Sequence, residues 1–261
     1  MLTHQKPKLD AIVSALWISL EKPERWVGLA EIEHSLPDAI FYETFVNVWT
    51  NSESNHLNLP LIDDLIERRG VYAGTVMPGL SVRDRQLYEN LKEDPIVYRG
   101  ATVEEPHTDY SWTADRKQAL WLARRCHRAT PALVTGRVDP EKVLFAYAGR
   151  GESEIAVRNG DVADKSVEPI GDYRSDSRSE LSPDVTPGSL DAMFDPVTML
   201  TSRFRAMIMR DGESVEDVRR MAMRDVEQLE QLGFRAAPNA RRQLLNRVDW
   251  DRLGAPRSRF G

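Results

Sequence analysis

The stretch VYRGATVEEPHTDYSWT, Val97–Thr113, decides how the rest of this chain is interpreted. A β-rich run, Ile96-Val97-Tyr98, ends on Arg99 and Gly100, and the hydroxyl-bearing triplet Ser111-Trp112-Thr113 closes the stretch. Arginine is the side chain best shaped to bind phosphate through two parallel hydrogen bonds, and glycine lets a ligand approach the backbone. Each of these residues alone is more often a surface or capping residue, so the interpretation depends on the rest of the chain.

The spacing of apolar residues changes on either side of this stretch. Before it, segments such as LDAIVSALWISLE and PLIDDLIERRG carry apolar residues at helical intervals. After it, ALVTGRV, KVLFAYA and SEIAV are typical of short strands, and ESVEDVRRMAMRDVEQLEQLGF is amphipathic and ends near Gly233. We therefore predict an α+β protein with a helical N-terminal region (1–93), a β-rich core (94–172), a polar linker or loop (173–189) and a helical C-terminal region (190–261).

One helix is expected inside the β-rich core, directly after Thr113. Thr113 or Asp115 could cap this helix, and Ala119, Leu122, Ala123 and Cys126 form its apolar stripe. Trp121 on the same helix is expected in the hydrophobic core, as is Cys126.

Composition excludes several classes of protein. The 261 residues are 41% hydrophobic and 29% charged, which is ordinary for a soluble globular protein. The single cysteine permits no internal disulfide, and the five histidines lack ligand spacing, so no metal is expected. We find no signal peptide and no apolar run long enough to span a bilayer, which indicates a cytoplasmic protein without membrane partners. Arginines outnumber acidic residues from 201 onward, which leaves an acidic or nucleic-acid partner open, but their alternation with acidic residues favours a solvated helix surface.

A third cluster of polar residues opens a strand later in the core. Glu152 and Glu154 flank Ser153 before IAV, and alternate residues of a strand point to the same face. Two like charges on one face are unfavourable unless something binds there. From the spacing alone, an exposed edge strand with two solvated glutamates is the more common explanation.

In order, these clusters resemble the arginine–serine–glutamate class of ADP-ribosyltransferases, in the form found in small phage and bacterial proteins. That family carries an aromatic-Arg-Gly, then Ser-x-Ser or Ser-x-Thr, then Glu-x-Glu or Gln-x-Glu. The matching residues here are Tyr98-Arg99-Gly100, Ser111-Trp112-Thr113 and Glu152-Ser153-Glu154. The resemblance covers roughly residues 95–160 and implies a split β-sheet core with NAD as the substrate.

The resemblance also implies a role for each residue. Glu154 would stabilise the positive charge that develops on the ribose of NAD, Ser111 would hold Glu154, and Glu152 would prepare the acceptor. Arg99 and Gly100 would contact NAD. The other NAD-binding candidates, of which the aromatic side chains would stack on nicotinamide, are Tyr98, Trp112 and Thr113, with Tyr110 and Tyr147 as further possible stacking partners.

Three functions follow from these residues. The favoured one is NAD-dependent mono-ADP-ribosylation of a macromolecule, with a protein acceptor preferred to nucleic acid and a host-cell acceptor if the chain is encoded by a phage. The second is NAD hydrolysis without a specific acceptor. The third is a non-catalytic interaction or virion protein with the same fold, because helical regions make up over half of the chain.

Overall fold

The computed structural model describes residues 6–52, 55–104, 110–125, 130–151, 153–171 and 196–253. Packing divides the chain into two compact units. Unit 1 is formed by Met1–Pro37, Asn47–Ile62 and Ser182–Gly261, and unit 2 by Asp38–Val46 and Asp63–Leu181. The units thus combine segments that are far apart in the sequence, whereas the expected regions were consecutive. The polar linker proposed for 173–189 lies outside the described residues.

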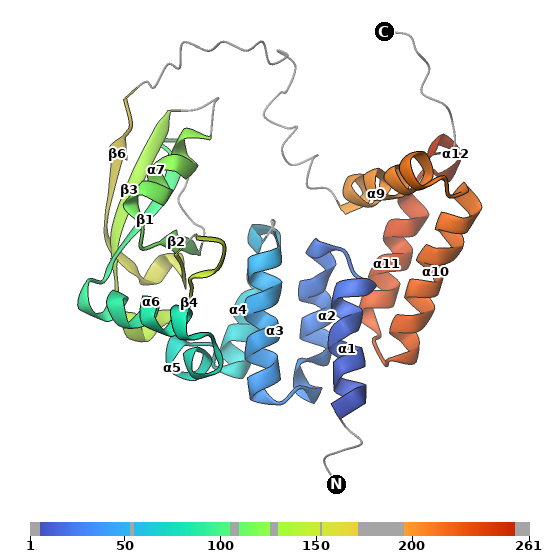
Figure 1. The fold of residues 1–261 in the computed structure, drawn as a ribbon, viewed down its shortest axis with the longest axis horizontal. Coiled ribbons are helices and arrows are strands. Elements are labelled where there is room, and N and C mark those ends of the chain that lie inside the picture. The colour runs from blue at the N-terminus through green and yellow to red at the C-terminus, as the bar shows by residue number, and fades with distance from the viewer. Residues whose placement is uncertain are drawn as a thin grey trace. The chain divides into compact units, whose positions relative to one another are not determined.

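Unit 1 is helical, and two helices are shared with unit 2 (Figure 1). Unit 1 contains α1 (Lys6–Ile18), η1 (Lys22–Glu24), α2 (Arg25–Ile32), η2 (Glu33–Ser35), η3 (Asn55–Asn58), α9 (Pro196–Asp211), α10 (Val215–Gln231), α11 (Ala236–Arg247) and α12 (Trp250–Leu253). The division between units falls inside α3 (Asp38–Asn51) and α4 (Leu59–Arg69), so each contributes residues to both.

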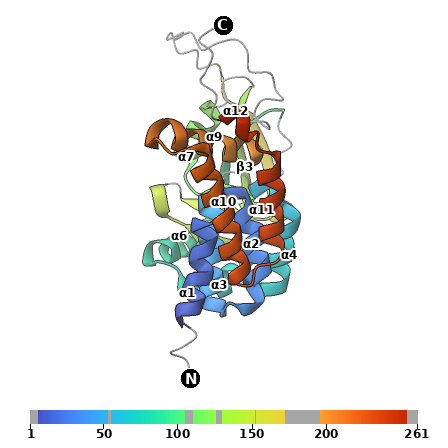
Figure 2. The same cartoon turned by 90° about the vertical axis from the view of Figure 1, so that its right-hand side faces the viewer.

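The C-terminal helices of unit 1 enclose their own hydrophobic core. α10 and α11 run side by side and α9 lies across one end of them (Figures 1 and 2). The amphipathic pattern of α10 places one apolar face inward, and Ser214 caps its start by accepting a hydrogen bond from the Asp217 amide at 3.0 Å. Gly233 follows its end with φ of 92°, as the sequence predicted. The core residues are Leu200, Phe204, Val218, Ala222, Val226, Leu245, Val248 and Leu253.

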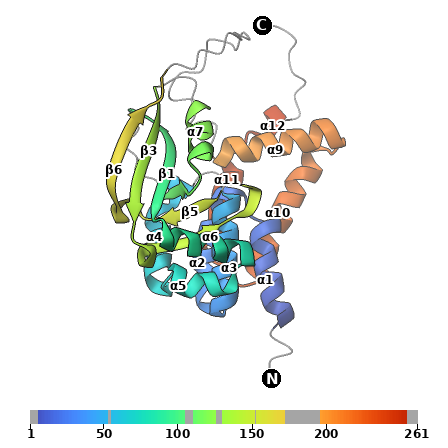
Figure 3. The same cartoon turned by 60° about the vertical axis from the view of Figure 1, so that its left-hand side comes forward.

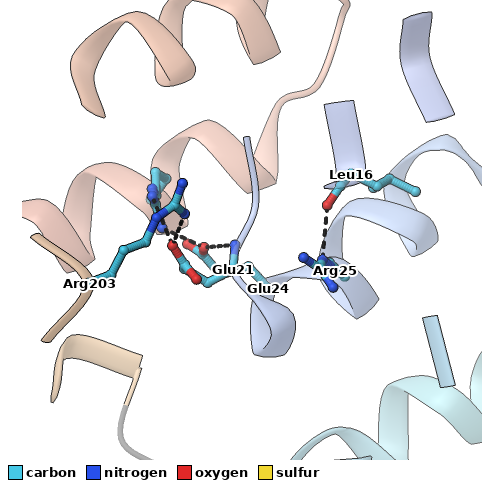
Figure 4. Close-up of polar contacts among 6 residues, drawn as sticks. Leu16, Glu21, Glu24, Arg25 and Arg203 are labelled. Atoms are coloured by element: carbon cyan, nitrogen blue, oxygen red, sulfur yellow. Dashed lines mark hydrogen bonds and ion pairs between the residues drawn. The ribbon is translucent and has the colours of Figure 1, made fainter. Parts of the chain in front are cut away.

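Charged side chains connect the N-terminal and C-terminal segments of unit 1. Arg241 of α11 is 1% exposed and donates from Nη1 to Glu24 Oε2 at 2.8 Å. Burial raises the pKa of Glu24, and the positive charge of Arg241 opposes that rise. Glu21 forms a second ion pair with Arg203, which Figure 4 shows. The Arg241–Glu24 pair is buried, whereas the Arg203 side chain of the second pair is 46% exposed.

Unit 2 contains a six-stranded antiparallel sheet with strand order β4-β5-β2-β1-β3-β6. The fold is therefore α+β, as predicted from the sequence. The strands are β1 (Ile96–Thr102), β2 (Ser111–Thr113), β3 (Pro131–Val138), β4 (Val143–Tyr147), β5 (Glu154–Val157) and β6 (Val162–Pro169). The helical elements of this unit are α5 (Ala73–Val76), η4 (Met77–Gly79), α6 (Val82–Glu93), α7 (Arg116–Arg124), η5 (Pro140–Lys142), η6 (Gly149–Gly151) and η7 (Asn159–Asp161).

The sheet has two halves that meet at a narrow joint. Seven residue pairs join β1 to β3, whereas Tyr98↔Thr113 is the one registered pair between β1 and β2. Figure 3 shows β5 crossing at a steep angle to the long strands β1, β3 and β6. One half therefore comprises β1, β3 and β6, and the other comprises β2, β5 and β4.

Helix α7 lies directly against β1, and Gly100 makes this close approach possible. A Cβ atom at Gly100 would lie 2.2 Å from the Ala119 carbonyl oxygen and 2.4 Å from the Ala123 amide nitrogen. Ala119 and Ala123 are both fully buried. At about 100° per residue Trp121 lies opposite these two alanines, so it is on the outer face and is 53% exposed. The expectation that Trp121 belongs to the core was wrong.

We expect the substitution Gly100→Ala to destabilise the protein by about 1–3 kcal/mol, because overpacking forces backbone shifts of this cost. Gly160→Ala is the matched control, since a Cβ atom at Gly160 meets nothing within 4 Å. The control should change the free energy of unfolding by less than about 0.5 kcal/mol. Urea unfolding of both variants measures this difference, and equal stabilities would contradict the close packing of α7 on β1.

Candidate functional site

The structure brings Arg99, Ser111 and Glu154 together at the joint between the two halves of the sheet. Arg99 lies on β1 next to Tyr98, the residue that pairs with β2. Ser111 begins β2 and Glu154 begins β5, and these strands are antiparallel neighbours. Thr113 lies opposite Glu154, so Ser111 and Glu154 are diagonal neighbours on one face.

Two hydrogen bonds connect these three residues. Ser111 Oγ donates to Glu154 Oε1 at 2.5 Å, and Arg99 Nη1 donates to the carbonyl oxygen of Ser111 at 2.8 Å. Glu154 is only 9% exposed. A buried carboxylate that accepts a hydroxyl hydrogen bond at this distance is held in one orientation. Arg99 is thus linked to the backbone of Ser111, and Glu154 to its hydroxyl.

The loop before Glu154 contains two left-handed residues. Gly151 has φ of 71° and Ser153 has φ of 45°, a region that residues other than glycine rarely adopt. The Ser153 carbonyl accepts a hydrogen bond from the Ala114 amide at 3.0 Å, which ties the loop to the end of β2. Backbone strain of this kind is concentrated at functional sites. Glu152, the expected acceptor-activating residue, lies outside the described residues.

The other expected NAD-binding residues differ in how far they are exposed and in what they contact. Trp112 is 2% exposed and packs in the core, so its ring is not at the surface. Thr113 is also buried, and its Oγ1 accepts a hydrogen bond from the Asp115 amide at 3.0 Å. Tyr98 is partly exposed and lies between Thr113 and Thr135 in register. The absence of a side chain at Gly100 is explained by the approach of α7.

A polar network beside Ser111 was not found from the sequence. Tyr110 Oη donates to both carboxylate oxygens of Asp63 on α4, at 2.9 Å each. Arg158, which follows β5, pairs with Asp63 at 3.3 Å and with Glu67 at 2.6 Å. These contacts attach the start of β2 and the end of β5 to one helix. No sequence signal could have identified Tyr110 and Asp63 as partners, since 47 residues separate them.

The described residues contain neither a metal-binding cluster nor a helix able to cross a membrane. Within the part of the chain that is described, no three His, Cys, Asp or Glu side chains are grouped so that they could hold a metal ion. None of the described helices combines the length and apolar character needed to cross a bilayer. Comparisons with protein-family models, curated proteins and solved structures gave no match to this chain.

Two chemical properties follow from this geometry. The first is electrostatic: a carboxylate removed from water stabilises a nearby developing positive charge more strongly than a solvated one does. The second is positional, because the Ser111 hydroxyl fixes that carboxylate before any ligand arrives. An anionic group on a ligand could be bound by the adjacent Arg99 guanidinium.

The network around Tyr110 predicts a pH dependence of stability. Burial, followed by the hydrogen bond to Asp63, raises the pKa of Tyr110 to about 12 from an ordinary value of 10.0. The folded protein then retains a phenolic proton that the unfolded chain loses, so this contribution is complete below pH 10 and decreases as pH rises from about 10 toward 12. Urea unfolding midpoints between about pH 9 and 11 should fall more steeply for the wild type than for Tyr110→Phe.

Asp63→Asn provides the matched control for this prediction. It removes the negative charge but leaves the burial of Tyr110 unchanged, so the pH dependence should be reduced without being abolished. Parallel pH profiles for the wild type and Tyr110→Phe would show that Tyr110 does not titrate as described.

Proposed function

We propose that this protein is an NAD-dependent mono-ADP-ribosyltransferase of the arginine–serine–glutamate class, with a split-sheet core of the corresponding fold. The main support is the Ser111 Oγ to Glu154 Oε1 hydrogen bond at 2.5 Å. It links two residues 43 positions apart whose motifs were recognised separately in the sequence. The division of the sheet into two halves, joined at Tyr98 and Thr113, further supports the split-sheet assignment.

In the proposed reaction, the bond between ribose C1′ and the nicotinamide nitrogen breaks. The bonding electron pair goes to nicotinamide, which loses its positive charge, and the ribose develops oxocarbenium character as in glycoside hydrolysis. Glu154 stabilises that positive charge from the side of the ribose hydroxyls. A nucleophile on the acceptor then forms a new bond to C1′ and gives up a proton.

The neighbouring residues have roles that suit this reaction. Arg99 binds the diphosphate of NAD, since a guanidinium can donate to phosphate oxygens in parallel. Ser111 acts as a positioning residue, because it fixes the Glu154 carboxylate through its hydroxyl. Glu152 receives the acceptor proton, and the resemblance connects a glutamate at that place with arginine acceptors.

Nicotinamide release from NAD tests this proposal. Glu154→Gln should abolish release, since a neutral amide cannot offset a developing cation. Ser111→Ala should lower kcat about ten- to a hundredfold while KM for NAD changes little, which corresponds to losing a charged hydrogen bond of about 1.5–3 kcal/mol. Ser166→Ala removes an exposed hydroxyl on β6 and should retain full activity. Wild-type rates for Glu154→Gln, with the fold intact, would refute the proposal.

A second assay separates transfer from hydrolysis. Wild-type protein is incubated with labelled NAD and a cell lysate, and protein-bound label is measured beside free ADP-ribose. Glu152→Gln should suppress labelling of protein while hydrolysis continues, because water needs little activation to attack an oxocarbenium-like centre. Free ADP-ribose without any labelled macromolecule would instead identify the protein as an NAD glycohydrolase.

A further inference from the structure

The outer face of α7 carries a basic and aromatic stripe that the proposed reaction does not use. We define the α7 stripe as Lys117, Trp121, Arg124 and Arg125, all of which are exposed. At 100° per residue, these four positions fall within roughly 60° of Trp121 on the helix surface. The inner face of the same helix carries the buried Ala119 and Ala123, so the stripe points away from the sheet.

Exposed tryptophan is the unusual component of the α7 stripe. Trp121 is 53% exposed, and the guanidinium carbon of Arg125 lies 4.8 Å from the centroid of its ring. A large aromatic side chain left in water with a cation beside it contributes little to the core of unit 2. The pair instead presents a flat apolar surface with a positive charge at its edge.

The charge of the α7 stripe differs from that of the whole chain. The chain has a formal net charge of -6, yet the segment from Arg116 to Arg125 contains four basic residues and no acidic one. Arg116 lies outside the stripe and is 3.6 Å from Glu168 of β6. The positive charge is therefore local, and it complements a negatively charged ligand.

We propose that the α7 stripe binds single-stranded nucleic acid. Lys117 to Arg125 spans about 12 Å along the helix, the rise of three to four stacked nucleotides at about 3.4 Å each. The cations contact successive phosphates, and an unpaired base stacks on Trp121. An acidic peptide would satisfy the cations but offers no flat ring for Trp121, and the bases of a duplex are stacked out of reach.

This inference does not rest on the proposed reaction, and its test needs no NAD. Fluorescence anisotropy measures binding of the full chain to a labelled single-stranded oligonucleotide of about 20 nucleotides, longer than one site of about 4–16 nucleotides. Binding is measured from about 50 to 200 mM salt, because phosphate contacts weaken over this range. We expect the single strand to bind more tightly than a duplex of the same length.

Two variants examine the two components of the α7 stripe. Trp121→Ala should weaken binding about 5- to 150-fold, the effect of losing one stacked base. The triple variant Lys117→Gln, Arg124→Gln, Arg125→Gln should weaken binding and reduce the slope of log affinity against log salt by about 2, since each phosphate contact contributes about 0.7. Glu154→Gln should bind the oligonucleotide as the wild type does.

A charge-matched triple variant serves as the control. Arg83→Gln, Lys92→Gln, Lys142→Gln removes the same number of exposed charges elsewhere on the chain and should bind normally. The inference is overturned if the wild type binds no oligonucleotide at about 50 mM salt, if the control weakens binding as much as the α7 triple variant, or if Trp121→Ala binds unchanged. Binding of polyglutamate, but of no oligonucleotide, would assign the surface to an acidic protein partner instead.

Discussion

The sheet of unit 2 holds together at one narrow joint, the pair formed by Tyr98 of β1 and Thr113 of β2. On its other edge β1 pairs with β3 along its whole length, and the shorter strands β2, β5 and β4 continue the sheet from the edge that carries Tyr98↔Thr113. Because β1 and β2 share so little strand pairing, side-chain hydrogen bonds add to the connection between them. Arg99 supplies one by donating to the Ser111 carbonyl, and the Ser111 hydroxyl extends the connection to Glu154. The residues of the candidate site therefore also form hydrogen bonds that connect the two halves of the sheet.

Two buried glutamates show how differently a carboxylate can be used in this chain. Glu24 in unit 1 forms an ion pair with Arg241, which is 1% exposed, inside a helical bundle. Glu154 in unit 2 accepts a hydrogen bond from a neutral serine at the joint of a sheet. Arg241 compensates the charge of Glu24 inside the bundle, whereas the Glu154 carboxylate is positioned by the hydroxyl of Ser111, a residue of the second motif. This contrast favours Glu154 over Glu24 as a functional carboxylate.

Local patterns in the sequence predicted much of the fold. Apolar spacing indicated α1, α4 and α10, and Gly233 marked the end of α10. Strand β6 carried no such signal, because it is exposed along nearly all of its length and lacks an apolar face. The exposure of Trp121 could have been predicted, since helical periodicity puts it opposite the stripe that contains Ala119 and Ala123; the expectation of a buried tryptophan followed its residue type instead.

Some residues of the candidate site could be identified from sequence motifs, and others only from the structure. The order of the three motifs indicated that Arg99, Ser111 and Glu154 belong together, and the structure places them within a chain of two hydrogen bonds. Trp112 was included because of its neighbours in the motif, yet strand alternation turns it into the core. The bonds from Tyr110 to Asp63 join segments without any shared local pattern, so only the folded chain reveals them.

The central claim is that NAD binds at the joint of the sheet, beside Arg99, Ser111 and Glu154. Titration of isotope-labelled protein with NAD, followed by amide chemical-shift changes in NMR spectra, tests this claim directly. The account predicts shifts concentrated at Tyr98–Gly100, Ser111–Thr113 and Ser153–Glu154, with little change in α9–α12. Saturating NAD that leaves these amides unmoved, or that shifts only residues of unit 1, would contradict it.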